Sequence, residues 1–155
     1  MIKIKIESKY SEIDRSNGRQ FSSMVVIISP EDKVLLLHRQ DVPEIRFRNL
    51  WSFPGGGSDA NEKPHQTAIR EVHEETGLRL DPDCLTLLHK KIVGEKYVYF
   101  YACDSYSEEV DPERVREEHQ NFAWVNPNDL DMYHTTKDCE YAIRKAFKTN
   151  ELIME

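Results

Sequence analysis

The chain has 155 residues, of which 39% are hydrophobic and 32% are charged, and its formal net charge is −7. This composition is typical of one soluble globular domain, expected over residues 1–155, and it argues against a disordered or membrane protein. The longest apolar run, residues 24–28, is far shorter than the roughly 20 residues of a membrane-spanning helix. The negative charge disfavours binding to a nucleic acid duplex.

The cysteines and the N-terminus bear on the compartment. Cys84, Cys103 and Cys139 are far apart and form no CxxC pair, which argues against a disulfide framework and a thiolate zinc site. The N-terminal sequence MIKIKIESK alternates apolar and charged residues and lacks the apolar stretch of a secretory signal. We therefore expect a cytoplasmic protein, with no membrane partner and with an edge strand or arm over residues 1–20.

The first half of the chain predicts strands followed by a helix. Residues 22–29 read as a buried strand and residues 33–39 as a second strand after a Pro-Glu-Asp turn, so we expect a hairpin. Residues 41–50 are polar and irregular, which predicts a surface loop, and residues 51–53 read as a short extended piece. The spacing over residues 64–76 predicts a helix that begins at Pro64 and stops at Gly77.

The second half adds more strands and a closing helix. Residues 86–93 and 96–103 predict a strand pair that turns at Gly94-Glu95, and residues 104–121 predict a long acidic loop. Residues 121–125 read as a strand and residues 137–148 as a helix. Strands with two separated helices predict a mixed α/β (α+β) fold, with a mixed sheet covered on both faces.

The helix predicted over residues 64–76 has two distinct sides. One side would lie on the sheet and carries Ala68, Ile69, Val72 and Thr76. The adjacent side carries Glu71, Glu74 and Glu75, which are three or four positions apart and therefore converge. Because Arg70 is the one residue placed to pair with them, the cluster is typical of a Mg²⁺ site. The alternative is an acidic, solvated face.

The segment before this helix, WSFPGGGSDANE, contains three consecutive glycines that permit close backbone approach. By itself Pro54-Gly55-Gly56-Gly57 could be a plain turn. The whole pattern has fixed spacing and consists of Gly56, Glu62, Arg70-Glu71-Val72, Glu74-Glu75 and Gly77-Leu78. This pattern resembles the Nudix box, here residues 56–78, with all nine specified positions filled.

The resemblance extends beyond the box, over roughly residues 22–148. It includes the strand end at residues 36–39, the Trp51-Ser52-Phe53-Pro54 segment and Trp124-Val125. It implies a Nudix-type α/β/α sandwich with a mixed sheet between helices. Asp59 and Asn61 differ from the residues common in the family. Lys63 stands where a Thr or Ser helix cap is common, which would weaken the helix start.

The resemblance also implies an activity, the Mg²⁺-dependent hydrolysis of a nucleoside diphosphate linked to a group X, with Mn²⁺ an alternative metal. It implies four metal ligands, namely Glu71, Glu74, Glu75 and the carbonyl oxygen of Gly56 (or of Gly55). Glu71, Glu74 and Arg70 would be catalytic, with Arg70 orienting a glutamate or contacting phosphate. Gly55, Glu62 and Gly77 would support the box.

The general base is drawn in this family from a box glutamate or from a later loop. Glu118 lies six residues before Trp124, where some relatives place a further carboxylate, so it is a fourth catalytic candidate. It could instead be a solvated acid among the glutamates of residues 108–117. His119 is the alternative base, although a lone loop histidine is more often inert.

Substrate contacts are expected from Arg39 and from the aromatic residues Trp51, Phe53 and Tyr99, because a base stacks on an aromatic ring. Tyr99 alternates with Tyr97 and Tyr101 along a strand, which also fits a core position. The ADP-ribose subgroup usually has a proline some 15 residues after the box, and no proline lies near that position here, since Pro82 follows Leu78 by four residues. Tyr97 lies close to, but not at, the position of the tyrosine typical of the dinucleoside polyphosphate subgroup.

This elimination favours a nucleoside triphosphate or modified dNTP pyrophosphohydrolase that releases a nucleoside monophosphate and pyrophosphate. Dinucleoside polyphosphate hydrolysis, nucleotide-sugar hydrolysis and a non-catalytic nucleotide sensor remain alternatives. The isoprenoid diphosphate isomerase of the same fold needs a catalytic cysteine, and the three cysteines here lack a suitable context. A homodimer remains open.

Overall fold

The computed structural model describes the backbone of residues 20–154 and the side chains of residues 20–148. The strand or arm expected over residues 1–20 lies outside this part of the chain, apart from Gln20. A four-stranded mixed sheet has the order β4-β1-β7-β6, and a three-stranded antiparallel sheet has the order β3-β2-β9. The strands of the two sheets are β1 (Phe21–Ile27), β2 (Val34–Arg39), β3 (Trp51–Ser52), β4 (Gly55–Gly57), β6 (Thr86–Val93), β7 (Lys96–Cys103) and β9 (His119–Val125).

The remaining elements are helices and one short strand pair. The strand pair joins β5 (Arg79–Leu80) with β8 (Tyr106–Ser107). The α-helices are α1 (Pro64–Thr76), α2 (Pro112–Glu118) and α3 (Cys139–Met154), and the 3₁₀ helices are η1 (Pro82–Cys84) and η2 (Pro127–Met132). None of the described helices is long and apolar enough to cross a membrane.

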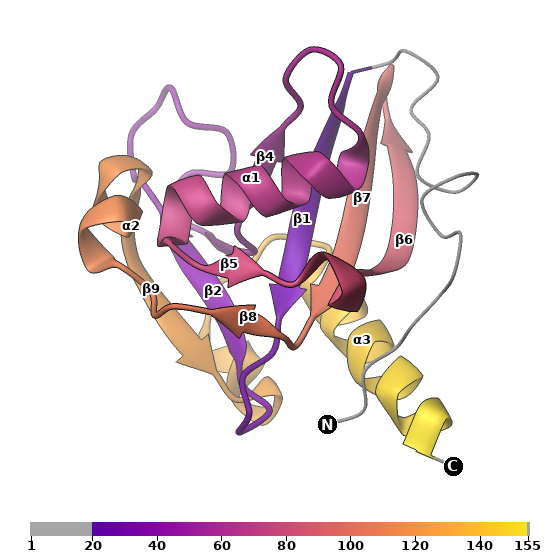
Figure 1. The fold of residues 1–155 in the computed structure, drawn as a ribbon. Coiled ribbons are helices and arrows are strands. Elements are labelled where there is room, and N and C mark those ends of the chain that lie inside the picture. Colours follow the sequence, from indigo (N-terminus) through magenta and orange to yellow (C-terminus); the bar gives the residue numbers. More distant parts are fainter. Residues whose placement is uncertain (1–19, 155) are drawn as a thin grey trace.

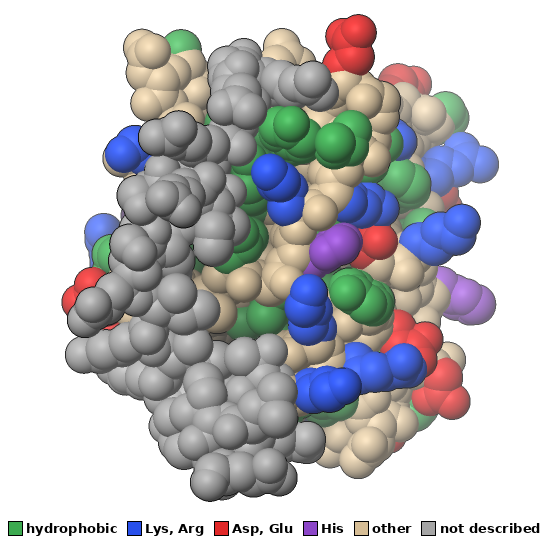
Figure 2. Space-filling view, turned by 90° about the vertical axis from the view of Figure 1, so that its right-hand side faces the viewer, with side chains coloured by type: hydrophobic (Ala, Val, Ile, Leu, Met, Phe, Trp, Pro, Cys, Tyr) green, Lys and Arg blue, Asp and Glu red, His purple; other side chains and the backbone are tan. Residues whose placement is uncertain are grey.

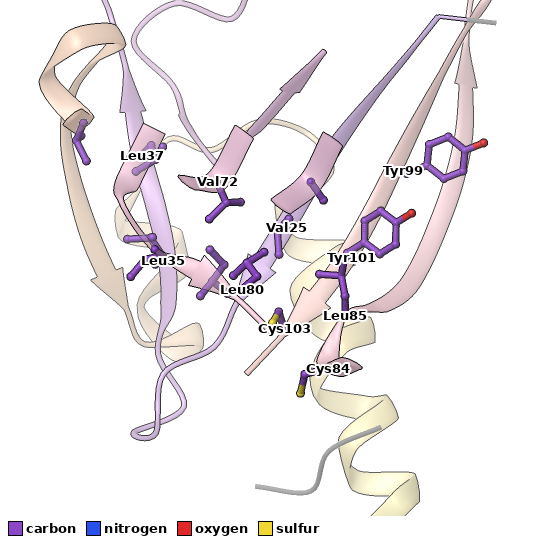
Figure 3. Close-up of a cluster of buried hydrophobic side chains, with 14 of the residues drawn as sticks. Val25, Leu35, Leu37, Val72, Leu80, Cys84, Leu85, Tyr99, Tyr101 and Cys103 are labelled. Atoms are coloured by element: carbon purple, nitrogen blue, oxygen red, sulfur yellow. The ribbon is translucent and has the colours of Figure 1, made fainter. Parts of the chain in front are cut away.

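Two hydrophobic clusters lie on opposite faces of β1, because alternate residues of a strand point to opposite sides. Val25 and Ile27 join the cluster under α1 with Val72. Val26 and Ile28 join the cluster that contains residues of α3. The helices α1 and α3 accordingly cover the two sides of the sheet (Figure 1). Figure 3 shows the first cluster, with side chains from β1, β2, β7 and α1 directed toward one another. The predicted mixed sheet covered on both faces is confirmed.

The predicted hairpin of the first two strands is wrong. Ser29 donates a backbone hydrogen bond to Lys33, and a single bridge joins Ile28 to Val34, but β1 and β2 then separate into different sheets. β1 pairs instead with β4 and, in parallel, with β7. The tight turn was readable locally, whereas the parallel pairing joins segments some 75 residues apart and left no local signal.

The predicted long acidic loop over residues 104–121 is also wrong, because it contains β8, α2 and the start of β9. The helix α2 begins in the usual way: the side chain of Asp111 accepts a hydrogen bond from the Glu113 amide, and Pro112 occupies the first turn. The strands β6 and β7 and the turn between them match the prediction, as does α3 apart from its bounds.

Candidate active site

The helix α1 has the predicted ends. Pro64 occupies its first turn, and Gly77 adopts φ +83° after it while donating to the His73 carbonyl over 2.9 Å. Lys63 is extended and precedes the helix, and its backbone N–H donates to the Gln66 side chain over 2.9 Å. Gln66 thus supplies a polar contact at a helix start that lacks a Ser or Thr cap.

One face of α1 fixes its position on the sheet. Ala68, Val72 and Thr76 are fully buried, and Ile69 packs against the same cluster. The Thr76 hydroxyl donates to the Val72 carbonyl over 2.6 Å, so its polar group is satisfied within the core. The predicted sheet-facing side is confirmed, and it sets the direction of the glutamates on the adjacent side.

The glycine segment forms the edge strand β4 and is more than a plain turn. Gly55 pairs with Met24 of β1 and has φ +149°, and a Cβ on it would lie 2.1 Å from the Ser23 carbonyl oxygen. A Cβ on Gly56 would lie 2.6 Å from the carboxyl carbon of Glu71. Glycine is therefore required at position 55, where the β1 backbone approaches directly, and a side chain at position 56 would displace the Glu71 carboxylate.

Glu75 and Glu71 are the carboxylates turned toward this strand. Glu75 is 8% exposed and accepts a hydrogen bond from the Gly55 amide over 2.8 Å. Burial raises the pKa of Glu75 well above its ordinary value, although the Gly55 hydrogen bond opposes this shift. Burial also raises the pKa of Glu71, against the opposing charge of Arg70. Both groups are ready to accept a cation that would offset their desolvation.

Arg70 connects the remaining acidic groups of the site. Its guanidinium forms ion pairs with four carboxylates and donates to the Gly57 carbonyl over 2.9 Å. The four carboxylates are Asp59, Glu62, Glu71 and Glu74. The Arg70 hydrogen bond is the main reason that the pKa of Glu62 falls to about 2. Arg70 therefore neutralises the outer part of the cluster and ties the helix to β4.

The remaining predicted site residues are Glu74, Glu118 and Arg39. The side chain of Glu74 is 56% exposed and contacts Arg70 at 3.1 Å. Glu118 ends α2 and is exposed, and its charge raises the pKa of both Glu71 and Glu75. The charge of Arg39 acts in the opposite direction and lowers the pKa of Glu75. The fold thus brings Arg39, from β2, and Glu118 to the box glutamates.

His119, the alternative base, is 7% exposed, and its Nδ1 atom is buried without a hydrogen-bond partner. Burial, followed by the charge of Arg39, lowers its pKa to about 4. The imidazole is therefore neutral at neutral pH and is enclosed, whereas Glu118 is exposed to solvent.

A hard divalent cation fits these donors by their chemistry. Glu71 and Glu75 are desolvated oxygen donors beside Gly56, and Glu118 adds a further negative charge nearby. Within the described part of the chain, no three acidic, histidine or cysteine side chains are already gathered into a metal site. Arg70 draws Glu74 and one oxygen of Glu71 to itself, which accounts for the spread of the donors.

The structure corrects the predicted aromatic contacts. Tyr99 is fully buried and packs edge-on against Phe21, and Phe53 is 3% exposed and packs edge-on against Phe100. Both rings belong to the core, so neither presents a face to a substrate. Trp51 is half-buried and stacks on His38 with the rings 4.5 Å apart.

Three supporting contacts were not predicted from the sequence. Thr67 donates to Glu62 over 2.8 Å, Asp59 lies 3.3 Å from Arg70, and the Asp59 amide donates to Glu62 over 2.7 Å. The Thr67 and Glu62 positions are five residues apart, across the helix start, so helical spacing gave no signal for this pair. Together they fix the carboxylate of Glu62 under Arg70.

The family model described as the NUDIX domain matches residues 18–146. The chain belongs to the Nudix family. The box glutamates, the glycine strand and Arg70 described above all lie within the residues that this model matches.

Relatives of this Nudix protein carry several activity names. A Bacillus subtilis protein provisionally named an 8-oxo-dGTP diphosphatase is 27% identical over 113 residues, which cover 72% of this chain and 69% of that protein. Nucleoside triphosphatase NudI of Escherichia coli is 28% identical over 148 residues and is covered over 99% of its length, against 87% of this chain. An RNA pyrophosphohydrolase of Francisella tularensis is 39% identical over 67 residues, 43% of this chain and 39% of that protein.

Solved structures agree on the fold. A MutT structure from work on the Aliivibrio salmonicida and Vibrio cholerae proteins has a TM-score of 0.70 at 19% identity, and the match covers 84% of this chain and 98% of that one. A MutT Nudix hydrolase of Burkholderia pseudomallei has a TM-score of 0.67 at 26% identity, over 81% of this chain and 96% of that one. The predicted Nudix-type sandwich is confirmed.

Proposed function

We propose that this Nudix hydrolase is a divalent-metal-dependent nucleoside triphosphate or modified dNTP pyrophosphohydrolase, which releases a nucleoside monophosphate and pyrophosphate. The proposal rests chiefly on one observation, the two desolvated carboxylates of Glu71 and Glu75 held against Gly55 and Gly56. Burying two such groups together is unfavourable unless a cation joins them. Mg²⁺ is the expected cation, with Mn²⁺ an alternative.

The side chains have separable roles in the proposal. Glu71, Glu74, Glu75 and the Gly56 carbonyl would hold the metal, which would supply Lewis-acid chemistry at the diphosphate bridge. Glu118 accepts the proton of the attacking water, because it is exposed and lies within electrostatic range of Glu71 and Glu75. Arg70 positions Glu71 and Glu74 through its ion pairs. Arg39 contributes positive charge toward the substrate phosphates.

The choice of substrate follows from the relatives. NudI, which is named a nucleoside triphosphatase, is matched along nearly its whole length, whereas the RNA pyrophosphohydrolase match covers less than half of that protein. This difference favours a free nucleotide over the 5′ end of an RNA. Dinucleoside polyphosphates and nucleotide sugars remain second candidates, since they contain the same bridge. We also propose that the protein is cytoplasmic.

The test is a substrate panel followed by ³¹P NMR. Nucleoside triphosphates, 8-oxo-dGTP, a dinucleoside tetraphosphate and a nucleotide sugar are incubated with Mg²⁺, with Mn²⁺, or with excess EDTA. We expect a nucleoside monophosphate and pyrophosphate from a triphosphate, and no turnover in EDTA. Water enriched in ¹⁸O identifies the phosphorus atom that is attacked, because the label enters one product.

The matched variant is Glu74→Gln, which keeps the shape of an exposed side chain and removes its charge. We expect it to slow hydrolysis by orders of magnitude while the protein stays folded. Release of a nucleoside diphosphate and orthophosphate would refute the substrate assignment. Full turnover in EDTA would refute the metal mechanism, and tight nucleotide binding without any product would favour a sensor.

A further inference from the structure

A nucleobase gains affinity from an accessible aromatic face, and the predicted aromatic residues do not supply one. Tyr99 and Phe53 are in the core, and the indole of Trp51 is stacked on His38 with an interplanar angle of 4°. The ring of Tyr133 also packs against Trp51, edge to face at 5.1 Å. The rings nearest to the box in sequence are therefore already engaged with protein.

Two aromatic side chains in the described part of the chain are at least half exposed, Phe47 at 51% and Tyr141 at 50%. Tyr141 lies on α3, and its ring packs against His89 of β6. The β6 side of the molecule mixes hydrophobic, basic and histidine side chains and faces the viewer in Figure 2. Phe47 instead lies on the loop between β2 and β3, which runs above α2 on the other side of the molecule (Figure 1).

Hydrogen bonds connect the Phe47 loop to the active site. The Arg39 Nε atom donates to the carbonyl of Arg46 over 2.9 Å, and the charge of Arg39 acts on Glu75. Gln120, two residues after Glu118, donates to the Arg39 carbonyl over 2.7 Å and to the Asn49 side chain over 3.0 Å. The backbone just before Phe47 is therefore a single hydrogen bond away from the arginine that faces the box glutamates.

The conformation of Phe47 is unusual for its residue type. Its φ is +57°, the left-handed region that a bulky side chain rarely adopts. The guanidinium of Arg46 lies 4.7 Å from the centre of its ring. A strained backbone that holds an apolar ring in solvent between Arg46 and Arg48 indicates a functional constraint more than a packing one. Arginine and an aromatic ring are also the side chains on which bases stack.

We propose that Phe47 is a specificity-determining residue of this enzyme and stacks on the nucleobase of the substrate, with Arg46 supporting the ring from its other side. The proposal rests on the function proposed above. The Phe47 ring would bind the base while the box glutamates act on the phosphates, so base recognition and phosphate chemistry would reside on different segments. Because the base is remote from the reacting phosphorus, its contact contributes to substrate binding more than to the chemical step.

The experiment compares Phe47→Ala, Phe47→Trp and the matched control Val42→Ala. Val42 is an exposed apolar residue on the same loop, with 38% of its surface accessible. Alanine and tryptophan both keep a Cβ atom, so neither substitution removes the steric strain of the left-handed backbone at this position. Each variant is assayed with a nucleoside triphosphate and with ribose 5-triphosphate, which has the same phosphates and no base. Affinity for an α,β-methylene nucleotide is measured separately by calorimetry.

We expect Phe47→Ala to raise KM for the nucleoside triphosphate roughly 5- to 150-fold, the factor that stacking of one base represents, with kcat nearly unchanged. Its kinetics with ribose 5-triphosphate should match the wild type, Phe47→Trp should restore nucleotide binding, and Val42→Ala should have no effect. Repeating the assay on a 5′-triphosphorylated RNA distinguishes a free nucleotide from the first nucleotide of an RNA. A base-dependent penalty on either substrate supports the stacking role.

Two results would overturn the proposal. One is an unchanged KM and an unchanged affinity for the methylene nucleotide in Phe47→Ala. The other is an equal loss with the base-free substrate, which would mean that the substitution disturbs the phosphate site. These results differ from failure of the proposed function, in which the wild-type protein itself would not hydrolyse any triphosphate. In that case calorimetry with the methylene nucleotide still decides whether Phe47 binds a base.

Discussion

Replacing Glu75 by glutamine should stabilise the metal-free protein and inactivate it at the same time. Glu75 is 8% exposed, and burial raises its pKa well above the ordinary value. A carboxyl group whose pKa is raised in the folded state favours folding below its unfolded pKa, near 4.5, and this contribution is lost as pH rises toward the folded value. At neutral pH the raised pKa of Glu75 therefore lowers the free energy of unfolding.

The size of the effect follows from the same linkage. In the pH range where Glu75 is protonated in the folded chain but ionised in the unfolded chain, the free energy of unfolding falls by about 1.4 kcal/mol for each pH unit. Glutamine never ionises, and its side-chain oxygen can still accept the 2.8 Å hydrogen bond from Gly55. We expect Glu75→Gln to raise the free energy of unfolding in EDTA at neutral pH, and each 1 kcal/mol gained would raise Tm by roughly 2–4 °C in a domain of this size.

Glu74→Gln is the matched control, since it makes the same chemical change one position earlier. The Glu74 side chain is 56% exposed and forms an i,i+4 ion pair with Arg70. Losing an exposed pair of this kind should lower the free energy of unfolding by about 0.3–0.5 kcal/mol. The two variants should therefore shift Tm in opposite directions in EDTA, as measured by calorimetry. Added Mg²⁺ should raise Tm of the wild type by mass action and raise that of Glu75→Gln much less.

The reasoning would be refuted if Glu75→Gln melted at or below the wild-type temperature in EDTA. That result would mean that the Gly55 amide and Arg39 fully compensate the buried carboxylate. A catalytic rate near the wild-type value in Glu75→Gln would separately remove Glu75 from the proposed metal ligands.

Three further predictions concern the surroundings of the site. Val72→Asp should abolish the cooperative unfolding transition seen by circular dichroism, because it puts an unpaired charge at a fully buried position, at a cost of several kcal/mol. Glu62→Gln should lower the free energy of unfolding, measured in urea at pH 7, by about 1.5–3 kcal/mol, the contribution of a hydrogen bond to a charged group. The wild type should lose this stabilisation only as pH falls from 4.5 toward the folded pKa of Glu62, about 2. Equal acid sensitivity of the two proteins would contradict this prediction. His119 has a pKa of about 4 in place of 6.5, so it should contribute a loss of about 3 kcal/mol as pH falls between these values, and His119→Gln should lack this contribution when the two unfolding profiles are subtracted.

The parts of the fold that could be predicted are those with local physical causes. The helix α1 was readable because Pro64, Gly77 and the apolar spacing all act within a few residues of one another. The start of α2 also has a local signal, since Asp111-Pro112 is an ordinary helix start. The high acidic content of the region nevertheless favoured the prediction of a loop. The pairing of β1 with β7 could not be predicted, because it depends on packing between distant segments.

The same division holds for the site. Helical spacing predicts that the three box glutamates share one side of α1, but spacing says nothing about which of them is desolvated. That difference arises from β4, which covers Glu75 and contacts Glu71 while leaving Glu74 in solvent. The aromatic contacts were mispredicted for a related reason: Phe53 and Tyr99 look the same in sequence whether they line a site or fill a core, and only the packing distinguishes the two.

The distribution of charge over α1 explains why one arginine is enough for so acidic a helix. Arg70 pairs with the outer carboxylates, which are partly hydrated and therefore have a small desolvation cost. It also donates a hydrogen bond to the Gly57 carbonyl, which connects these carboxylates to β4. Arg70 contacts one oxygen of Glu71, and among the described ion pairs of Arg70 none is with Glu75. A second internal cation at Glu75 would stabilise the metal-free chain, but it would also compete with a metal ion for the same oxygens. The carboxylates that Arg70 neutralises therefore lie on the outer side of the cluster. The carboxylate charge that Arg70 does not neutralise lies at β4, where it would attract a bound cation most strongly.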